Sequence, residues 1–443
     1  MFMVRSNRRR PALAAVTAAS LVAASVVAVL VSPGSGGAAT APSKDSFYSY
    51  SGSTALKDIK PGTVLKTRTL AYHFVGIPLP LSVTQLLFRT TNAIGQPVVS
   101  VTSVVRPPGA DPAKVISYQS FYDSLNPDDS PSYAIAGGVT PGAFIPNAEL
   151  PIFGSFLAGG FNIVVPDTEG ETADFSAGPE YGMNTLDSIR AALNSPDAHL
   201  VSTAKVGMIG YSGGAIATGW AASLAPTYAP DVNKHLVGAA EGGILVDPDH
   251  NLHYINGSVV WAGVAVMSII GLARAYHVDL TPYMSDYGKQ LYAKLHSASI
   301  ATVLGAYPGL TWAKLAKPAY ATPESVPAFV KIANTINLGS YGAPTIPMFM
   351  GQGANGVLEG TPGLGKGDGV MVAADVRSLA RQWCAHGTTV KYVQYDLTSH
   401  VTTVPFWLPA AIEWLGARFG SSPAPQNCAS IKPGNSLAPI PAA

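Results

Sequence analysis

The sequence predicts an α/β fold in which a mostly parallel sheet is covered by helices on both faces. Short apolar segments rich in branched side chains, which are typical of buried strands, recur along the chain and alternate with helix-like segments. Such alternation is typical of parallel sheets, because each crossover connection lays a helix on one face. A chain of 443 residues, of which 47% are hydrophobic, can also bury a large core and still carry an insertion.

Eight segments are expected as strands, with helical segments between several of them. Two of the helical segments are "NTLDSIRAAL" and "VAADVRSLARQWCAH", and Gly387 after the second is a natural helix stop. The expected strands, in chain order, are "VLKTRTLAYHF", "VVSVTSVV", "KVISYQSF", "FNIVVPD", "KVGMIGY", "LVGAAEG", "IPMFMGQ" and "VKYVQYDL".

Residues 1–41 are expected to be an export signal peptide. Four arginines in the first ten residues precede an uncharged run to Val31, and small residues at Ala39 and Ala41 suit cleavage after Ala41. An uncleaved membrane anchor and a twin-arginine signal are the alternatives. Export predicts a secreted or cell-envelope protein.

The charge of the chain argues against a nucleic-acid partner. Charged residues make up only 12% of the chain, about half of the usual share of roughly 25%. Loss of residues 1–41 would remove four arginines and no acidic residue from a chain of net charge +1, which leaves a slightly acidic protein. We therefore expect no basic face, and no nucleic acid is predicted to bind.

An inserted helical cap is expected between two parts of the sheet domain. Residues 42–244 and 344–420 carry the strand signals, residues 245–343 are rich in Tyr, Ala and Leu, and residues 421–443 are a Pro-rich tail. Within the cap, "YINGSVVWAGVAVMSIIGLA" is uncharged and long enough to span a membrane. A span there would separate the strands across a bilayer, so a buried or lipid-facing cap helix is expected instead.

The two cysteines, Cys384 and Cys428, are expected to form a disulfide that fastens the C-terminal tail. Both lie near the end of a chain that is expected to be exported, and disulfides are common in exported proteins. Two free thiols are the alternative. By loop entropy the bond would contribute at most about 4 kcal/mol.

The stretch "KVGMIGYSGGAIATG" at residues 205–219 places Ser212 in a turn between a buried strand and a charge-free helix. A strand that reverses at once into a helix brings the two backbones close together. Gly210 and Gly214 remove the side chains that would collide there, as in a nucleophile elbow. The alternative is a tight glycine turn whose serine only caps the helix.

A nucleophilic serine needs a histidine base and a carboxylate that orients the base, in the chain order acid and then histidine. His400 is the expected base, because it follows the strand "VKYVQYDL" and precedes the helix "PFWLPAAIEWLGARF". Asp368 in "GDGV" is the expected acid, with an N-cap of the next helix as its alternative role. Glu359 is the second candidate, because its glycine-rich loop could bring it over the site.

A metal site is the alternative interpretation of "DPDHNLHY", which holds Asp247, Asp249, His250 and His253. Residues of this kind in a polar loop are more often solvated, so no metal is expected.

Several segments in order resemble the secretory lipase family of the α/β-hydrolases, which includes lipase A type enzymes, and in particular its exported bacterial members. The resemblance spans most of the mature chain. It rests on "SYQSFYDS", "VVPDTEG", "LDSIRA", "GYSGGA", "GDGVMVAADVRSLARQWCAHG" and "SHVTT".

The resemblance implies an α/β-hydrolase fold with a helical lid, and an oxyanion hole made by the backbone amides of Gly213 and Asp123. Two preorganised N–H donors of this kind stabilise the developing alkoxide. Where many family members have a cysteine after "YDS", this chain has "LNPDDSPS", and a long glycine-rich segment precedes Asp368. Both are departures from the family pattern.

Together these features predict a secreted serine hydrolase of carboxylic esters, most consistent with lipid esters such as acylglycerols. It would act through Ser212, His400 and Asp368 and an acyl-enzyme, with no cofactor and no obligate protein partner. The cap could contact a lipid surface. The alternatives are an acyltransferase on the same fold and a non-catalytic lipid-binding protein.

Overall fold

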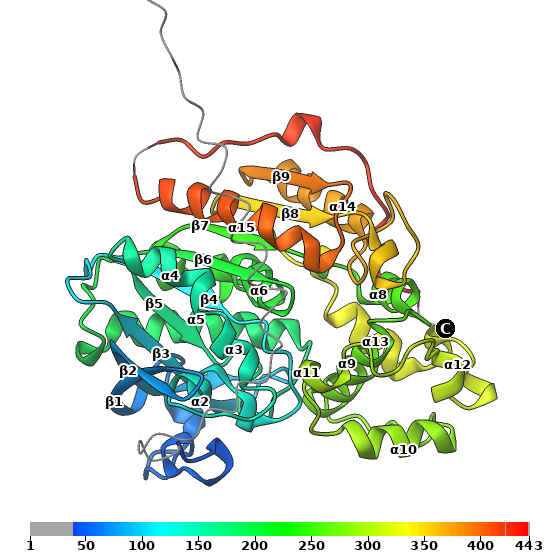
Figure 1. Ribbon diagram of the computed structural model, residues 1–443, viewed down its shortest axis with the longest axis horizontal. Coiled ribbons are helices and arrows are strands. Elements are labelled where there is room, and N and C mark those ends of the chain that lie inside the picture. Colours follow the sequence, from blue (N-terminus) through cyan, green and yellow to red (C-terminus); the bar gives the residue numbers. More distant parts are fainter. Residues whose placement is uncertain (1–38, 421, 442–443) are drawn as a thin grey trace, which may run out of the picture. The chain divides into compact units, whose positions relative to one another are not determined.

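The computed structural model describes residues 39–420 and 422–441, so nearly all of the expected signal peptide lies outside the described residues. Within this part of the chain, nine strands form one sheet in the order β1-β2-β3-β5-β4-β6-β7-β8-β9 (Figure 1). From β5 to β9 along this order all neighbouring strands are parallel, whereas β1, β2 and β3 pair in antiparallel fashion. The predicted α/β fold with a mostly parallel sheet is confirmed.

The strands are β1 (Val64–Phe74), β2 (Ile77–Thr91), β3 (Pro97–Arg106), β4 (Lys114–Gln119), β5 (Asn162–Pro166), β6 (Lys205–Tyr211), β7 (Leu236–Gly242), β8 (Met348–Gly353) and β9 (Val390–Tyr395).

Strand β2 has no counterpart among the expected strands. Its first part, "IPLPL", contains two prolines, which cannot donate to a β ladder and so argue against a strand. The prolines are tolerated because this part forms one arm of a hairpin with the edge strand β1. Phe74 pairs with Ile77 across a two-residue turn in which Val75 and Gly76 both have positive φ, and such turns match the twist of a hairpin.

Helices cover both faces of the sheet, and each face has its own apolar core. Helices α5 (Gly178–Asn194), α6 (Gly213–Tyr228) and α14 (Ala373–Ala385) pack on one face, around Trp220 and Trp383. On the other face, α4 (Leu150–Ala158) and α15 (His400–Ala417) enclose a core that contains Trp407 and Trp414. Three short helices complete this part, namely α2 (Pro131–Ile135), α3 (Phe144–Ala148) and α7 (Pro230–Asn233).

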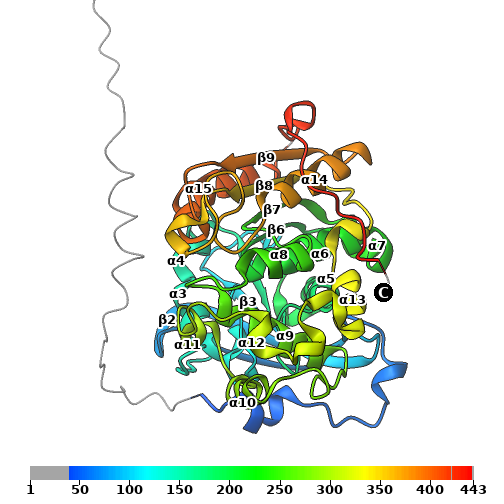
Figure 2. The same ribbon diagram turned by 90° about the vertical axis from the view of Figure 1, so that its right-hand side faces the viewer.

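The chain between β7 and β8 contains six α-helices that lie together beside the sheet (Figures 1 and 2). Residues of α8 to α12 contribute to a third apolar core, and α9, which carries most of the uncharged segment, buries Val264, Met267 and Ile270 in it. Among the described residues, no helix is both long and apolar enough for a membrane span. The helices are α8 (Pro248–Ile255), α9 (Ala262–Ala275), α10 (Asp286–Leu295), α11 (Ile300–Val303), α12 (Trp312–Leu315) and α13 (Pro327–Thr335).

The C-terminal tail is tied to the body of the protein. Cys384 at the end of α14 and Cys428 form the expected disulfide. Beyond it, the buried Ile431 packs against the core, and Ile440 exchanges two backbone hydrogen bonds with the side chain of Asn334 in α13. The tail therefore links α14 to the helices between β7 and β8.

Candidate active site

Ser212 occupies the sharp turn between β6 and α6, with φ +57° and ψ −122°. A non-glycine residue with positive φ is strained by about 1–3 kcal/mol, and such strain is common at functional sites. Its amide donates to the carbonyl of Gly242 at 2.9 Å, which ties the turn to the neighbouring strand β7. The structure thus has the strand–turn–helix arrangement that the sequence predicted around Ser212.

Gly210 and Gly214, two residues before and two residues after Ser212, allow β6 and α6 to lie close together. A Cβ atom at Gly210 would lie 2.2 Å from the carbonyl oxygen of Gly214, and one at Gly214 would lie 2.1 Å from the carbonyl oxygen of Gln119. Both distances are far below van der Waals contact, and the obstructing atoms belong to the backbone. A side chain at either position would therefore force β6, α6 or β4 apart.

The side chains of Ser212, His400 and Asp368 form one hydrogen-bonded chain. His400 Nε2 lies 2.8 Å from Ser212 Oγ, and His400 Nδ1 lies 2.8 Å from Asp368 Oδ2. The three residues are 8%, 3% and 0% exposed, so the hydrogen bonds are almost fully shielded from water. Ser212 follows β6, Asp368 follows β8 and His400 follows β9. The carboxyl ends of parallel strands meet at one edge of a sheet.

Hydrogen-bond donors fix the position of the Asp368 carboxylate. Its Oδ1 accepts from the amides of Val370 and Met371, at 3.0 and 2.7 Å, and its Oδ2 accepts from the side-chain amide of Gln352 at 2.8 Å. The alternative role of Asp368 as a helix cap is wrong, because α14 begins at Ala373 and its N-cap residue is Val372.

Glu359, the second candidate for the acid, lies near His400 but bonds to other groups. Its carboxylate accepts from Trp261 Nε1 at 2.7 Å and from the amide of Val401 at 3.0 Å. The ring of Trp261 in turn lies edge-on to the imidazole of His400, with ring centroids 5.1 Å apart. Glu359 therefore supports the wall of the site around His400, whereas Asp368 contacts the imidazole directly.

The surroundings of His400 favour its protonated form. Burial lowers the pKa of His400, but the charge of Asp368, the hydrogen bond that His400 donates to Asp368 and the charge of Glu359 raise it more, so that the pKa lies above its ordinary value. A histidine whose cation is stabilised in this way can accept a proton from a neighbouring hydroxyl.

His400 is the first residue of α15, and this start differs from the sequence expectation. From the sequence we expected the helix to begin at Pro405, after His400. Instead Ser399 caps the helix through a capping box with Thr402, and Pro405 and Pro409 lie inside it. The phenol of Tyr211 donates to the carbonyl of His400 at 2.6 Å and anchors this first turn.

Asp123 and Gly213, the two residues expected at the oxyanion hole, lie against each other beside Ser212. Gly213 is the first residue of α6, where backbone amides have no acceptor within the helix. Asp123 has φ +38°, and a Cβ atom at Gly213 would lie 1.7 Å from Asp123 Oδ1. Burial raises the pKa of the Asp123 carboxyl to about 8, so this group is largely neutral at pH 7.

An apolar pocket extends from these residues. Ser212, Gly213 and Asp123 form its polar end, and the rest of the wall is almost entirely hydrophobic. Side chains from α8, α9 and α13 supply much of that wall, among them Leu252, Val264, Ile269, Phe329 and Ile332. A pocket of this composition suits a long hydrocarbon chain whose polar end lies at Ser212.

Several residues of this site carried no recognisable sequence signal. Only the fold brings Gln352 into contact with Asp368 and Trp261 into contact with His400. In the sequence, Tyr211 stood out only as the neighbour of Ser212. The segment "DPDHNLHY" also differs from the expected polar loop, because most of it forms α8. There His250 lies 3.0 Å from Asp375 Oδ1 in α14.

Comparison with known proteins places the chain among lipases. A model of the family described as "Secretory lipase" matches residues 143–427. "Lipase 1" of Candida albicans is 32% identical over 410 residues, covering 87% of this chain and 82% of the relative. A Mycobacterium tuberculosis protein described as a "Probable inactive lipase" is 31% identical over 389 residues, covering 86% and 83%.

Solved structures agree with the sequence comparisons. Candida antarctica lipase A in its closed state superposes with a TM-score of 0.78 at 27% identity, covering 92% of this chain and 93% of that one. The rice cell wall degrading esterase LipA from Xanthomonas oryzae has a TM-score of 0.62 at 15% identity, which shows a shared fold. The chain belongs to the secretory lipase family.

Proposed function

We propose that the protein is a carboxylic ester hydrolase of the lipase type, with Ser212 as nucleophile, His400 as general base and Asp368 as the residue that orients it. The observation that carries the proposal is the pair of 2.8 Å contacts from the two ring nitrogens of His400 to Ser212 and Asp368. Family membership alone does not decide activity, since one relative is described as inactive. The complete hydrogen-bonded chain in this protein favours an active enzyme.

In the proposed reaction, His400 Nε2 accepts the proton of Ser212 as Oγ attacks the ester carbonyl. The resulting imidazolium gives the proton to the leaving alcohol, and an acyl-enzyme remains on Ser212. A water molecule activated by the same histidine then releases the acid. Throughout, Asp368 keeps the proton of Nδ1 directed toward itself and stabilises the imidazolium.

The amides of Gly213 and Asp123 are the proposed oxyanion hole. Gly213 lies at the N-terminus of α6, where the helix dipole favours negative charge. Removal of one such donor typically costs about 2.7–4 kcal/mol of transition-state stabilisation. The neutral carboxyl of Asp123 suits this role, because an ionised carboxylate beside the oxyanion would oppose the charge that develops there.

Lipid esters are the proposed substrates, because the apolar pocket beside Ser212 fits an acyl chain. The helices that form much of its wall, α8, α9 and α13, belong to residues 245–343, and we propose this insertion as a cap that can contact a lipid surface. Secretion with cleavage after Ala41 belongs to the same proposal. The disulfide between Cys384 and Cys428 supports it, since such bonds persist in oxidising compartments.

The first experiment is hydrolysis of nitrophenyl esters with short to long acyl chains by the mature protein. Ser212→Ala, His400→Ala and Asp368→Ala are expected to lose several orders of magnitude in kcat/KM, whereas Glu359→Ala stays active. A preference for long chains would support lipid esters. A folded wild type that neither hydrolyses any ester nor reacts with a fluorophosphonate at Ser212 would overturn the proposal and favour a lipid-binding protein.

Acyl transfer is the second candidate outcome, and analysis of the products separates it from hydrolysis. If the acyl-enzyme reacts with an added alcohol faster than with water, the main product is a new ester instead of the free acid. Product analysis by chromatography, with and without a glycerol or sterol acceptor, distinguishes hydrolysis from transfer.

A further inference from the structure

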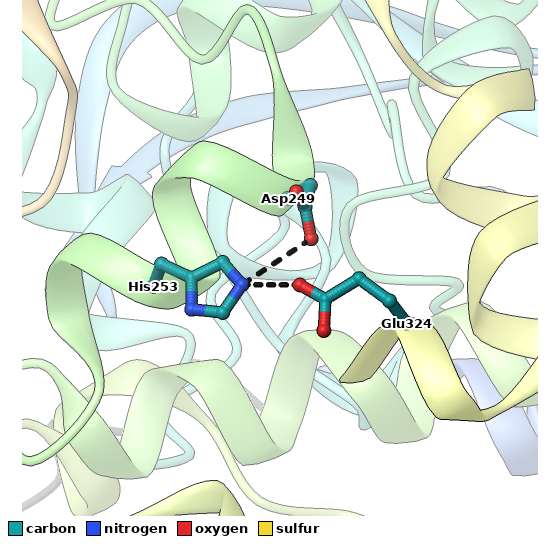
Figure 3. Close-up of side chains that lie close together, drawn as sticks. All are labelled: Asp249, His253 and Glu324. Carbon is teal, nitrogen blue, oxygen red and sulfur yellow. Dashed lines mark hydrogen bonds and ion pairs between the residues drawn. The ribbon is translucent and has the colours of Figure 1, made fainter. Parts of the chain in front are cut away.

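A second cluster of polar side chains lies away from Ser212, on the outer side of α8. Asp249 and His253 are four residues apart in this helix and therefore lie on one face. Glu324 reaches the same point from the short 3-10 turn Pro323–Ser325 (Figure 3). All three side chains direct one potential ligand atom to a common point, and these atoms lie within 4.8 Å of one another.

The contacts within this cluster place both carboxylates against one imidazole nitrogen. His253 Nε2 faces both carboxylates, at 3.7 Å from Asp249 Oδ1 and in direct contact with Glu324 Oε1 (Figure 3). One nitrogen carries at most one proton, so it cannot serve both acceptors fully. Asp249 Oδ1 is itself buried and has no hydrogen-bond partner among the described residues.

The two carboxylates also oppose each other electrically. Asp249 Oδ1 and Glu324 Oε1 both face His253 Nε2, and the two carboxylate oxygens lie within 4.8 Å of each other. A divalent cation between the carboxylates would replace this repulsion with attraction and would give Asp249 Oδ1 the partner that it lacks.

We propose that Asp249, His253 and Glu324 bind one divalent transition-metal ion, and Zn²⁺ is the ion that fits them best. An imidazole nitrogen with two carboxylate oxygens is a donor set that suits zinc, whereas Mg²⁺ and Ca²⁺ prefer oxygen ligands alone. Zinc bonds of about 2.0–2.2 Å place tetrahedral ligands roughly 3.4 Å apart. The 3.7 Å between His253 Nε2 and Asp249 Oδ1 is close to this, whereas Glu324, which contacts His253 directly, would have to move outward to admit the ion. The fourth position would belong to water.

The site connects two walls of the apolar pocket. The opposite side of α8 presents Leu252 and Ile255 to the pocket, and Val326 and Phe329, which follow Glu324 in the chain, line it as well. Metal binding would therefore fix the distance between α8 and the start of α13. This inference does not depend on the chemistry proposed for Ser212, because none of the three ligands touches that site.

Equilibrium dialysis of the tag-free mature protein against Zn²⁺, after removal of metals with a chelator, tests the proposal. Metal analysis is expected to find one zinc per chain for the wild type, with an affinity at least tenfold lower in His253→Gln and in Glu324→Gln. His253 and Glu324 have side chains 51% and 33% exposed, so both variants should fold. The matched control is His386→Gln, which removes a histidine bonded only to its own helix and should bind zinc like the wild type.

Thermal unfolding gives an independent readout. Saturating Zn²⁺ should raise the melting temperature of the wild type and of His386→Gln by about 2 °C or more, and should leave that of His253→Gln unchanged. Absence of bound zinc in the wild type at micromolar concentrations, or equal zinc binding by His253→Gln, would overturn the site.

Discussion

Gln352 donates its side-chain amide to the same oxygen of Asp368 that faces His400, at 2.8 Å. The other side of its amide accepts from the backbone of Ile244 at 2.9 Å, so Gln352 joins the loop after β7 to the proposed acid. Gln352 lies at the end of β8, is fully buried, and was not singled out by the sequence. It holds the Asp368 carboxylate in line with the imidazole.

Gln352→Leu should therefore lower kcat by about tenfold while KM changes little, because the substrate pocket is left intact. Steady-state kinetics on one nitrophenyl ester would measure the split. Gln394→Leu is the control, since Gln394 bonds to Arg377 and Asp396 in a more exposed position and should not affect kcat. An equal effect of both substitutions would argue against a positioning role.

The two carboxylates near His400 should respond very differently to neutralisation. Asp368→Asn removes the charge that stabilises the imidazolium, so kcat should fall about 10³-fold or more. Glu359→Gln keeps the size of the side chain and leaves the His400–Asp368 hydrogen bond in place, so activity should fall by less than about tenfold. A larger loss in Glu359→Gln than in Asp368→Asn would reverse the proposed assignment of the acid.

The dependence of kcat/KM on pH should show the effect of the Glu359 charge on His400. The base must be neutral, so kcat/KM should fall as the pH drops through the raised pKa of His400, at a pH above its ordinary value of about 6.5. Glu359→Gln removes a charge that raises this pKa, and the acidic limb should move to lower pH. A limb that stays in place or moves upward would show that Glu359 does not act on His400 electrostatically.

Local signals made the centre of the site predictable. Ser212 directly follows an apolar strand and has glycines on both sides. Asp368 and His400 follow later strands in the order that a triad requires. The parallel sheet then brings the three strand ends to one edge, so that a correct fold class and three correct loops suffice to bring these side chains together.

The parts that escaped prediction depend on contacts between distant residues or on local rules that the fold overrides. Trp261 and Glu359 meet across 98 residues of sequence, and Glu324 reaches His253 across 71 residues. The prolines of β2 and α15 argue locally against a strand and a helix interior, and the hairpin with β1 and the capping box at Ser399 define these elements instead.

The ion pair between His250 and Asp375 should make stability depend on pH. The hydrogen bond to Asp375 raises the pKa of His250 to about 9 against the cost of burial, and the charges of Asp375, Asp247 and Asp249 add to the increase. Because the folded pKa exceeds the unfolded value of about 6.5, the stabilisation is complete below pH 6.5 and is lost as the pH rises through 9. Denaturant midpoints from pH 6 to 10 should fall less steeply for His250→Gln than for the wild type. Parallel curves would contradict this account.

Two glycine-to-alanine substitutions should have opposite effects on stability. At Gly214 the new methyl group would lie 2.1 Å from the carbonyl oxygen of Gln119, so Gly214→Ala should disrupt the turn at Ser212 and lower both folding yield and activity. At Gly416, inside α15, the added Cβ would meet no heavy atom within 4 Å among the described residues, apart from its chain neighbours and the nearby backbone of its own helix. Gly416→Ala should therefore stabilise the protein by about 0.5–1 kcal/mol, since alanine favours a helix. Denaturation and ester hydrolysis measured on both variants would test the claim, and an active, fully stable Gly214→Ala protein would show that the strand and helix can separate at this turn without cost.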